Sequence, residues 1–599
     1  MSSVVGCARQ PQTIRSVRNV VLVTIDTLRA DHVGAYGYPR AHTPTIDAIA
    51  NGGVLFEHAY SAAPITLTSH ATMMTGRYPP GHGARDNGVR VSDTVPTLAS
   101  TLKASGFATA AFVAAFPLDH QFGLNRGFDL YSDRMPRGPD GKLLNERPAS
   151  QVVDEALRYL ESRTPNPESR RFVWIHLFEP HAPYGDPSSG GSAIDRYDAE
   201  IATADRELGR LLPSINRTDT AIVVAADHGE AFGEHGEYAH SIFVYDTTLR
   251  VPLVINAPGL SARHVMNRVT LADLAPTIAR LAGATMTDVD GIDLGPALTG
   301  GSLPARELYA ESFAPLLEFG WAPLRSIRSG NWKFIAAPTP ELFDIDRDAG
   351  EDRNVASQET QVAQQLGQRV GRYASASLTA NGAAPDAADR LRALGYSSRS
   401  QQPAASNRPD PKDRREIAAR IAQVTAGELT GDALMSALKT ILSADQTNSQ
   451  AHLRLGYGYV AKNDCAHAIP EFAAAANAGL PSADAHLGLA TCYGRQGDLA
   501  AADRALKEAQ RREPDNPVIS ANIGILQASR GEFADAIRSL TAALAKDPDL
   551  HEARFNLAIV YAKAGRRADA AAAARELLAR LPSNAPQRPE VERLLQSVQ

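Results

Sequence analysis

The chain has 599 residues, of which 44% are apolar and 21% are charged, and its formal net charge is −6 at pH 7. This length exceeds what a single core usually supports, so we expect two or more domains. The small net charge, spread over so long a chain, indicates neither nucleic acid nor a membrane surface as a partner. The sequence contains no run of about 18 apolar residues and therefore predicts no transmembrane segment. Three cysteines exclude a disulfide-rich scaffold but leave the redox compartment open.

Residues 1–18 form a predicted N-terminal tail. Within it, the segment Val4 to Cys7 is similar to the end of a bacterial lipoprotein signal, although the charged and apolar regions that should precede such an end are missing. If this segment is a truncated leader, we expect a periplasmic protein or a membrane-anchored lipoprotein. If it is a plain tail, we expect a cytoplasmic protein.

Three apolar runs in the N-terminal half each stop at acidic or imidazole side chains. They are VVLVTI before Asp26, FVWIHLFEPH with His176 and His181, and AIVVAA before Asp227 and His228. Parallel strands that are covered on both faces have such continuous apolar runs, and ligands bind outside their carboxyl ends. We therefore expect these five side chains to face one crevice.

Strand-like runs alternate with helix-like segments from about residue 19 to 300, for example residues 97–105 followed by 107–116. This alternation predicts an α/β fold with a largely parallel central sheet. Short strands within residues 324–335 and 341–345 predict a small antiparallel C-terminal subdomain, over about residues 300–396. Together they predict one catalytic domain over residues 19–396.

Residues 397–413 are polar and rich in Ser and Pro, a composition typical of a linker. Beyond them, residues 414–599 carry a repeat with a spacing of 34 residues, seen in small residues at one position type: Gly456, Ala490, Gly524 and Ala558. This is the period of a tetratricopeptide (TPR) repeat, in which small residues let two helices approach closely. The sequence predicts an all-α TPR solenoid that binds a protein or peptide partner.

The ends of this solenoid are predicted to be atypical. A weaker unit, with Ile421, Leu434 and Leu438 at matching positions, is expected before the four clear repeats. The last segment, residues 588–599, is expected to form a capping helix that shields the open end of the stack.

A single metal site needs carboxylates and neutral imidazole, with one position open for substrate. Asp26, Asp227 and His228 meet this need. Thr66 is the candidate nucleophile, because a hydroxyl bound to a divalent cation becomes effective near neutral pH. It precedes a helix-like stretch that we expect Thr68 or Ser69 to cap, and the positive end of that helix favours an anionic substrate.

Six ordered blocks of this sequence resemble signatures of the sulfatase family, within the alkaline phosphatase superfamily, over roughly residues 19–396. The blocks are NVVLVTIDTLRADHVGAYGY from Asn19, TSHATMMTGRYP from Thr68, ADHGEAFGEHG from Ala226, RVPLVI from Arg250, LADLAPTI from Leu271 and ELFDIDRD from Glu341. The resemblance implies a sandwich of the alkaline phosphatase type. It also implies a metal-dependent hydrolase that acts on an anionic ester.

The sequence departs from the family where the family's nucleophile stands. Formylglycine-dependent sulfatases carry Cys or Ser at the first position of a Cys/Ser-x-Pro-x-Arg signature, and in this chain the three defining positions hold Thr66, Thr68 and His70. Threonine is not converted to formylglycine by the usual route, so no formylglycine is expected. Asp26 is followed by Thr27 where the family has a second acidic residue, so one expected calcium ligand is absent.

The remaining set of Asp26, Thr66, Asp227 and His228 resembles the metal-plus-threonine arrangement of phosphodiesterases and of phosphoethanolamine or glycerophosphate transferases in the same superfamily. This resemblance implies zinc or manganese, with calcium as an alternative, and a covalent phosphothreonine intermediate. We predict cleavage of a phosphodiester or phosphonate ester through Thr66. Three alternatives stay open: a true sulfuric ester hydrolase, a transferase, and an inactive scaffold whose TPR array is the working part.

Five further residues are candidates for supporting roles. His240 falls where the resembling sulfatases have an anion-binding lysine, so it is expected to bind a substrate oxygen or to protonate the leaving group, and His181 is given the same catalytic role. His176, His70 and Arg29 are weaker candidates for substrate binding. His176 and His181 have a second metal site as an alternative, and Arg29 has a surface ion pair.

Overall fold

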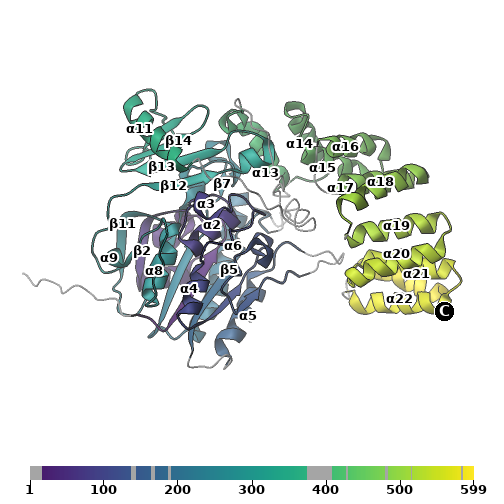
Figure 1. Cartoon of the computed structure of the whole chain (residues 1–599), viewed down its shortest axis with the longest axis horizontal. Helices are drawn as coiled ribbons and strands as arrows, with labels where there is room; N and C mark the ends of the chain where they lie inside the picture. The colour runs from purple at the N-terminus through teal and green to yellow at the C-terminus, as the bar shows by residue number, and fades with distance from the viewer. Residues whose placement is uncertain are drawn as a thin grey trace, which may run out of the picture. The chain divides into compact units, whose positions relative to one another are not determined.

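The computed structural model describes residues 16–136, 144–162, 169–185, 190–373, 408–425, 429–478, 483–514, 516–581 and 585–598. The segment Val4 to Cys7, the end of the predicted catalytic domain (374–396) and most of the predicted linker (397–407) lie outside these ranges. The chain divides into two compact units, the first holding most residues up to Glu428 and the second chiefly Leu429–Gln599 (Figure 1). None of the described helices is long and apolar enough to cross a membrane.

The first unit is built on a mixed sheet whose centre is parallel. Strand β1 (Asn19–Ile25) lies between β5 (Arg170–Leu177) and β6 (Thr220–Ala226) and pairs in parallel with both. The sheet order is β11-β2-β10-β6-β1-β5-β3-β4, with β9 paired to β2. The outer strands are β2 (Val54–Tyr60), β3 (Phe107–Phe112), β4 (Leu130–Ser132), β9 (Arg250–Val251), β10 (Leu253–Asn256) and β11 (Arg263–Thr270). Every residue of β6 is buried, as continuous apolar strands of a covered sheet require.

Two groups of helices pack against this sheet. One group consists of α1 (Pro44–Asn51), α5 (Ala149–Glu161) and α6 (Ala193–Leu211), in which α6 contacts both of the others. The other consists of α2 (Thr66–Thr75), α4 (Leu98–Ala104) and α8 (Leu274–Leu281), which all contact one another. The predicted α/β class with a largely parallel sheet is confirmed.

A second, antiparallel sheet completes the first unit, as the sequence predicts. Its order is β12-β13-β14-β15, with bounds Leu308–Ser312, Leu324–Ser329, Trp332–Ala336 and Glu341–Asp344. Helix α11 (Thr360–Val370) contacts β13 and β14, and its Leu366 and Val370 enter a shared core with Phe334.

Helix α13 (Arg415–Thr425) belongs to the first unit, although its residues were placed with the repeats in the sequence analysis. Its Ala418 is buried in a core cluster with Phe243 and Trp321, and Ile421 packs against the same cluster. The segment just before α13 also contacts the first unit, since the Thr339 amide donates to Asp410 Oδ2 at 2.9 Å. The 34-residue spacing cannot show which core a helix covers, and here the apolar face of α13 covers the first unit.

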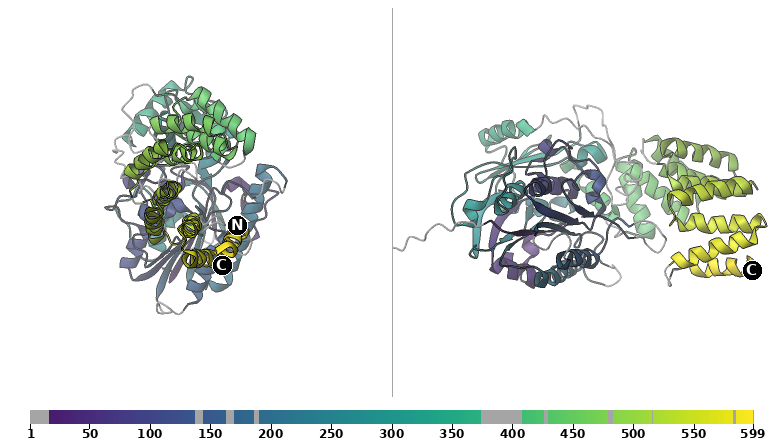
Figure 2. Two further views of the ribbon diagram at one scale, coloured as in Figure 1. Left: turned by 90° about the vertical axis from the view of Figure 1, so that its right-hand side faces the viewer. Right: turned by 60° about the horizontal axis from the view of Figure 1, so that its bottom comes forward.

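The second unit is a stack of helices, as the TPR period predicts (Figure 2). It contains α14 (Gly431–Ala444), α15 (Ser449–Ala461), α16 (Cys465–Asn477), α17 (Asp484–Arg495), α18 (Leu499–Arg512), α19 (Pro517–Ser529), α20 (Phe533–Lys546), α21 (His551–Lys563), α22 (Arg567–Arg580) and α23 (Arg588–Val598). A Cβ on Gly456 would lie 2.6 Å from the Phe472 ring, so the recurring small residue permits close helix contact. Val591 of α23 enters the core of the last repeat, as a capping helix should.

A disulfide between Cys465 and Cys492 joins α16 to α17 across 27 residues of sequence. Crosslinking a loop of this length lowers the entropy of the unfolded chain and stabilises the fold by about 3–4 kcal/mol. We expect the double variant Cys465→Ala, Cys492→Ala to lower the unfolding free energy of the second unit by about that amount in the absence of reductant. Chemical denaturation followed by circular dichroism measures it. Wild-type protein treated with reductant should match the variant, and equal stability of variant and oxidised wild type would contradict the prediction.

Candidate active site

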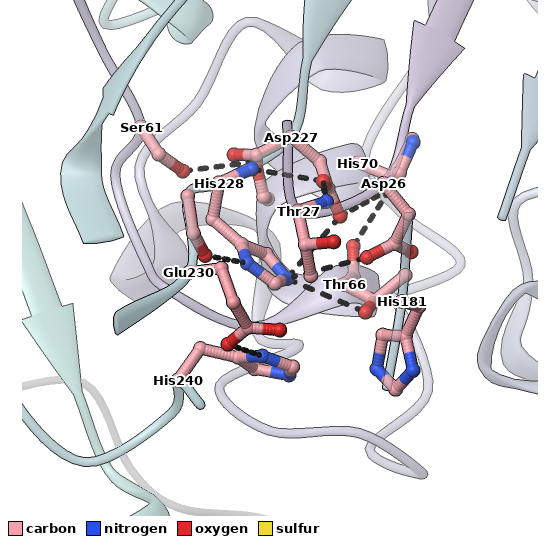
Figure 3. Close-up of polar contacts among 12 residues, drawn as sticks. Asp26, Thr27, Ser61, Thr66, His70, His181, Asp227, His228, Glu230 and His240 are labelled. Atoms are coloured by element: carbon pink, nitrogen blue, oxygen red, sulfur yellow. Dashed lines mark hydrogen bonds and ion pairs between the residues drawn. The ribbon is translucent and has the colours of Figure 1, made fainter. Parts of the chain in front are cut away.

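The carboxyl ends of β1 and β6 bring three predicted ligands together (Figure 3). Asp26 follows β1, and Asp227 and His228 follow β6, its parallel neighbour. His228 Nε2 lies 3.4 Å from Asp227 Oδ2 and 3.8 Å from Asp26 Oδ1, and all three side chains are fully buried. The crevice that the sequence predicts at this edge of the sheet therefore holds a compact group of two carboxylates and one imidazole.

The buried atoms of this group fit a divalent cation. Asp26 Oδ1 and Asp227 Oδ2 have no hydrogen-bond partner, and burial raises the pKa of Asp26 to about 8 and that of Asp227 well above its usual value. Burying two carboxylates without a counter-charge is costly. His228 donates from Nδ1 to the Gly229 carbonyl at 2.9 Å, which leaves the Nε2 lone pair facing the carboxylates, as a metal ligand requires.

Thr66 faces the same group from the first position of α2. Its Oγ1 lies 3.5 Å from His228 Nε2. The helix has Ile65 as its N-cap without a side-chain cap, so the expectation that Thr68 or Ser69 caps it is wrong. Ser69 instead donates to the Asp227 carbonyl at 2.7 Å, because it already lies one turn inside the helix. The start of α2 is thereby tied to the loop that carries the ligands.

His70 hydrogen-bonds to the backbone of Thr66, and its two ring nitrogens face other protein atoms. Its Nδ1 donates to the Thr66 carbonyl at 2.8 Å, and its Nε2 accepts from Thr24 Oγ1 at 3.0 Å. Trp174 Nε1 donates to the same Thr24 hydroxyl at 3.0 Å, which fixes the direction of this buried chain. Both ring nitrogens are engaged within the protein, so this geometry favours a positioning role for His70 over the substrate-binding role that the sequence suggests.

His176 likewise positions a ligand. Its Nε2 lies 3.3 Å from Asp26 Oδ2, and its Nδ1 accepts the Ala114 amide at 3.3 Å. Burial, together with the charge of Arg147, lowers the pKa of His176 to about 3, so the ring is neutral and Nε2 carries the proton. A neutral donor of this kind orients Asp26 and leaves its other oxygen free for a cation.

Two more histidines, His181 and His240, lie at the open side of the group, with ring centroids 5.2 Å apart (Figure 3). His181 donates from Nδ1 to the Ala182 carbonyl at 2.7 Å, and its buried Nε2 has no hydrogen-bond partner. The His240 ring lies 4.4 Å from that of His228, and its Nδ1 lies 3.1 Å from Glu230 Oε1. His240 thus adjoins both His181 and the predicted ligand His228.

Charge differs between these two rings. Burial lowers the pKa of His181 to about 3, so this ring is neutral. Burial also opposes the charged form of His240, but the charge and hydrogen bond of Glu230 outweigh it and raise the pKa of His240. His240 is therefore the one of the two that can give a proton.

Arg29 does not reach the group. Its guanidinium is held by Asp31 at 2.8 Å and by Glu234 at 2.7 Å, and it donates to the Glu230 carbonyl at 3.0 Å. The ion-pair alternative for Arg29 is thus the one that the geometry favours, because two carboxylates occupy the cation. Thr27, at the position of the absent acidic ligand, donates to the Pro180 carbonyl and offers no carboxylate.

Two further residues adjoin this site that the sequence did not single out, Asn87 and Glu230. Asn87 Oδ1 accepts the Leu67 amide at the start of α2 at 2.9 Å, while its buried Nδ2 has no hydrogen-bond partner. Glu230 is fully buried beside His240. Glu230 ends the motif ADHGE, two residues after His228, so its place in that motif could have indicated it. Asn87 lies 21 residues after Thr66, and no spacing rule pointed to it.

The chain is similar to known proteins in both of its parts. The sequence model of the Sulfatase family matches residues 18–284, and that of the Tetratricopeptide repeat matches residues 453–517 and 522–585. Choline-sulfatase of Rhizobium meliloti is 25% identical over an alignment of 431 residues, and the match covers 56% of this chain and 82% of that protein. Delta 4,5-hexuronate-2-O-sulfatase of Bacteroides thetaiotaomicron is 26% identical over an alignment of 427 residues, and the match covers 59% of this chain and 86% of that protein.

A solved structure supports the fold. The crystal structure of Ps i-CgsB has a TM-score of 0.52 and 22% sequence identity to this chain, covering 60% of this chain and 93% of the other. The protein thus joins an N-terminal hydrolase domain of the sulfatase family to a C-terminal array of tetratricopeptide repeats.

Proposed function

We propose that the first unit cleaves a phosphorus ester, either a phosphodiester or a phosphonate monoester, with Thr66 as the nucleophile. One observation carries this proposal: the hydroxyl of Thr66 lies 3.5 Å from the free nitrogen of His228, beside two buried carboxylate oxygens that lack partners. A cation bound by those groups would lie next to the Thr66 hydroxyl.

The residues that would hold the cation are Asp26, Asp227, His228 and Thr66. Two carboxylates and an imidazole suit zinc or manganese. A divalent cation bound there would act as a Lewis acid that lowers the pKa of the Thr66 hydroxyl and withdraws negative charge from the ester. The rest of the chemistry belongs to the protein's own side chains.

We expect hydrogen-bond donors at the start of α2 to bind the anionic ester. The amide of Asn87 is anchored through Oδ1 to the Leu67 N–H, so its unpartnered Nδ2–H points from a fixed position. The N-terminal turn of a helix adds a partial positive charge that favours phosphoryl oxygens. Asn87 is therefore the side chain that we expect to bind a non-bridging oxygen.

The reaction proceeds in two displacements. Deprotonated Thr66 Oγ1 attacks phosphorus, the bond from phosphorus to the substrate alcohol breaks, and His240 gives its proton to the departing alkoxide. Water then attacks the phosphothreonine and gives a proton to His240 as the bond to Thr66 Oγ1 breaks. Glu230 keeps the ring of His240 oriented and stabilises its protonated form in both steps.

The chemistry of threonine favours phosphorus over sulfur. Threonine carries a single oxygen on its β-carbon, so a covalent ester on Thr66 is released only by attack at the central phosphorus or sulfur atom. The second candidate is a sulfuric ester hydrolase, and the names of the similar choline-sulfatase and hexuronate-2-O-sulfatase favour it. An acceptor alcohol in place of water makes the same site a transferase.

The alternative to an enzymatic function is a catalytically inactive scaffold. The buried carboxylates oppose it, because such groups are costly to keep without a ligand. In either case the TPR array is expected to bind a protein or peptide, as repeats of this type suggest.

Turnover of four matched nitrophenyl substrates tests the proposal. The purified protein is assayed with zinc, manganese or calcium on the sulfate, the phosphate monoester, a phosphate diester and a phosphonate monoester. We expect the diester or the phosphonate to have the highest kcat/KM. Preference for the sulfate would replace the proposal by its second candidate, and no turnover of any of the four would favour the scaffold.

A further inference from the structure

An apolar cavity of about 270 Å³, about half open to solvent, is lined by residues that adjoin His181 and His240 in the chain. Three of its lining residues are direct chain neighbours of site residues: Ala182 follows His181, Ala231 follows Glu230, and Ala239 precedes His240. Neither His181 nor His240 lines the cavity itself; its wall is made by their chain neighbours. Ala231 and Ala239 pair directly with each other, so one small two-stranded sheet carries part of the cavity wall together with the neighbouring Glu230 and His240.

Four elements of the first unit make the walls of the cavity. The two-stranded sheet of β7 (Ala231–Phe232) and β8 (Tyr238–Ala239) contributes the rings of Phe232 and Tyr238, and the loop after His181 contributes Tyr184. The first turn of α6 contributes Ile194, and α13 closes the remaining side with Ala422 and Gln423. Aromatic and aliphatic side chains dominate, with few polar groups to satisfy a sugar or a charged head group.

We propose that this cavity binds the alcohol part of the substrate, and that this part is a small apolar group, aromatic or short-chain aliphatic. The proposal rests on the proposed function for the position of the ester, but it is independent of whether the central atom is phosphorus or sulfur. Size supports it, because a dry cavity of about 150 Å³ already accommodates benzene. The volume admits one substituted ring.

The wall made by α13 gives the cavity a specificity determinant that lies outside the Sulfatase match at residues 18–284. Helix α13 is fixed by Ala418 in the core and by Arg415, which donates to the Tyr245 hydroxyl at 2.9 Å. Its Ala422 is therefore held against the cavity by a rigid element. A larger side chain at residue 422 fills space that the substrate alcohol would occupy.

Two measurements on the full chain test this proposal. The first is the ratio of kcat/KM for a p-nitrophenyl ester and an ethyl ester of the same acid. The second is the affinity of the resting protein for 4-nitrophenol, measured by titration calorimetry, which needs no turnover. In Ala422→Phe we expect the affinity for 4-nitrophenol and the preference for the nitrophenyl ester each to fall by about tenfold or more, because the ring loses its apolar contacts.

The controls separate this result from misfolding and from failure of the proposed function. Glu416→Phe places the same side chain on an exposed position of α13 outside the cavity and should leave both quantities unchanged. Ile194→Phe fills the cavity from the opposite wall and should reproduce the effect of Ala422→Phe. If the two filling variants keep wild-type affinity for 4-nitrophenol, or if wild-type protein does not bind it, the proposal is overturned. If 4-nitrophenol binds as expected while no phosphorus ester is cleaved, only the proposed function fails.

Discussion

Thr66→Ala is expected to abolish turnover while leaving the fold intact. The variant removes the hydroxyl that lies 3.5 Å from His228 Nε2, and loss of a nucleophile typically lowers kcat by about 10³-fold or more. The fold should persist, because alanine is a better helix former than threonine at this first helical position. Steady-state kinetics on the preferred ester, with melting temperature alongside, measures both effects.

Two control variants sharpen this expectation. Thr66→Ser keeps the hydroxyl and should retain measurable turnover, together with a phosphorylated peptide that contains residue 66 in mass spectra of quenched reactions. Thr68→Ala removes a buried hydroxyl two residues along the same helix, one that has no hydrogen-bond partner, and should leave kcat nearly unchanged. Undiminished turnover by Thr66→Ala would contradict the assignment of Thr66 as the nucleophile.

Loss of the bound cation is expected to have an effect of similar size. Asp227 contributes an unpartnered, fully buried oxygen to the group, so Asp227→Asn removes a charged ligand and should weaken cation binding by two orders of magnitude or more. Zinc or manganese bound per chain, measured by inductively coupled plasma mass spectrometry after dialysis, should fall from about one to near zero.

Stability provides a readout of the cation that does not depend on activity. A cation at about 100 times its Kd stabilises the native state by about 2.7 kcal/mol, so a chelator should lower the melting temperature of the wild type and leave that of Asp227→Asn unchanged. The matched control is Asp119→Asn in the partly exposed cluster of Asp119, His120 and Asp133, which should alter neither quantity. A wild-type chain that binds no zinc, manganese or calcium at stoichiometric level would support the inactive scaffold.

The strand ends were predictable because their signal is local. Each of the runs before Asp26 and Asp227 is continuous and apolar, and parallel neighbours must end at the same edge of a sheet, so sequence alone brings these ligands together. The 34-residue period is equally local, since each repeat contacts chiefly its neighbours.

Other features depend on contacts between distant segments, which no local pattern encodes. Whether His70 meets a substrate or the Thr66 carbonyl depends on a rotamer inside the core, and the sequence shows only that the residue is near Thr66. Arg29 is neutralised by Glu234, 205 residues away, and Asn87 reaches α2 from a loop. The pairing of Cys465 with Cys492 and the docking of α13 on the first unit belong to the same class.

The position of α13 also has a mechanical consequence. The helix stands between the two units in the chain and is packed, through Ala418, in the core beneath Phe243, three residues after His240. Tension that a bound partner exerts on the array, where it travels along the backbone from Leu429, reaches α13 first. The first elements to feel such a load are the anchors of this helix and β8, which ends at Ala239. Pulling on the C-terminal array would therefore deform the edge of the catalytic site before it strains the central sheet.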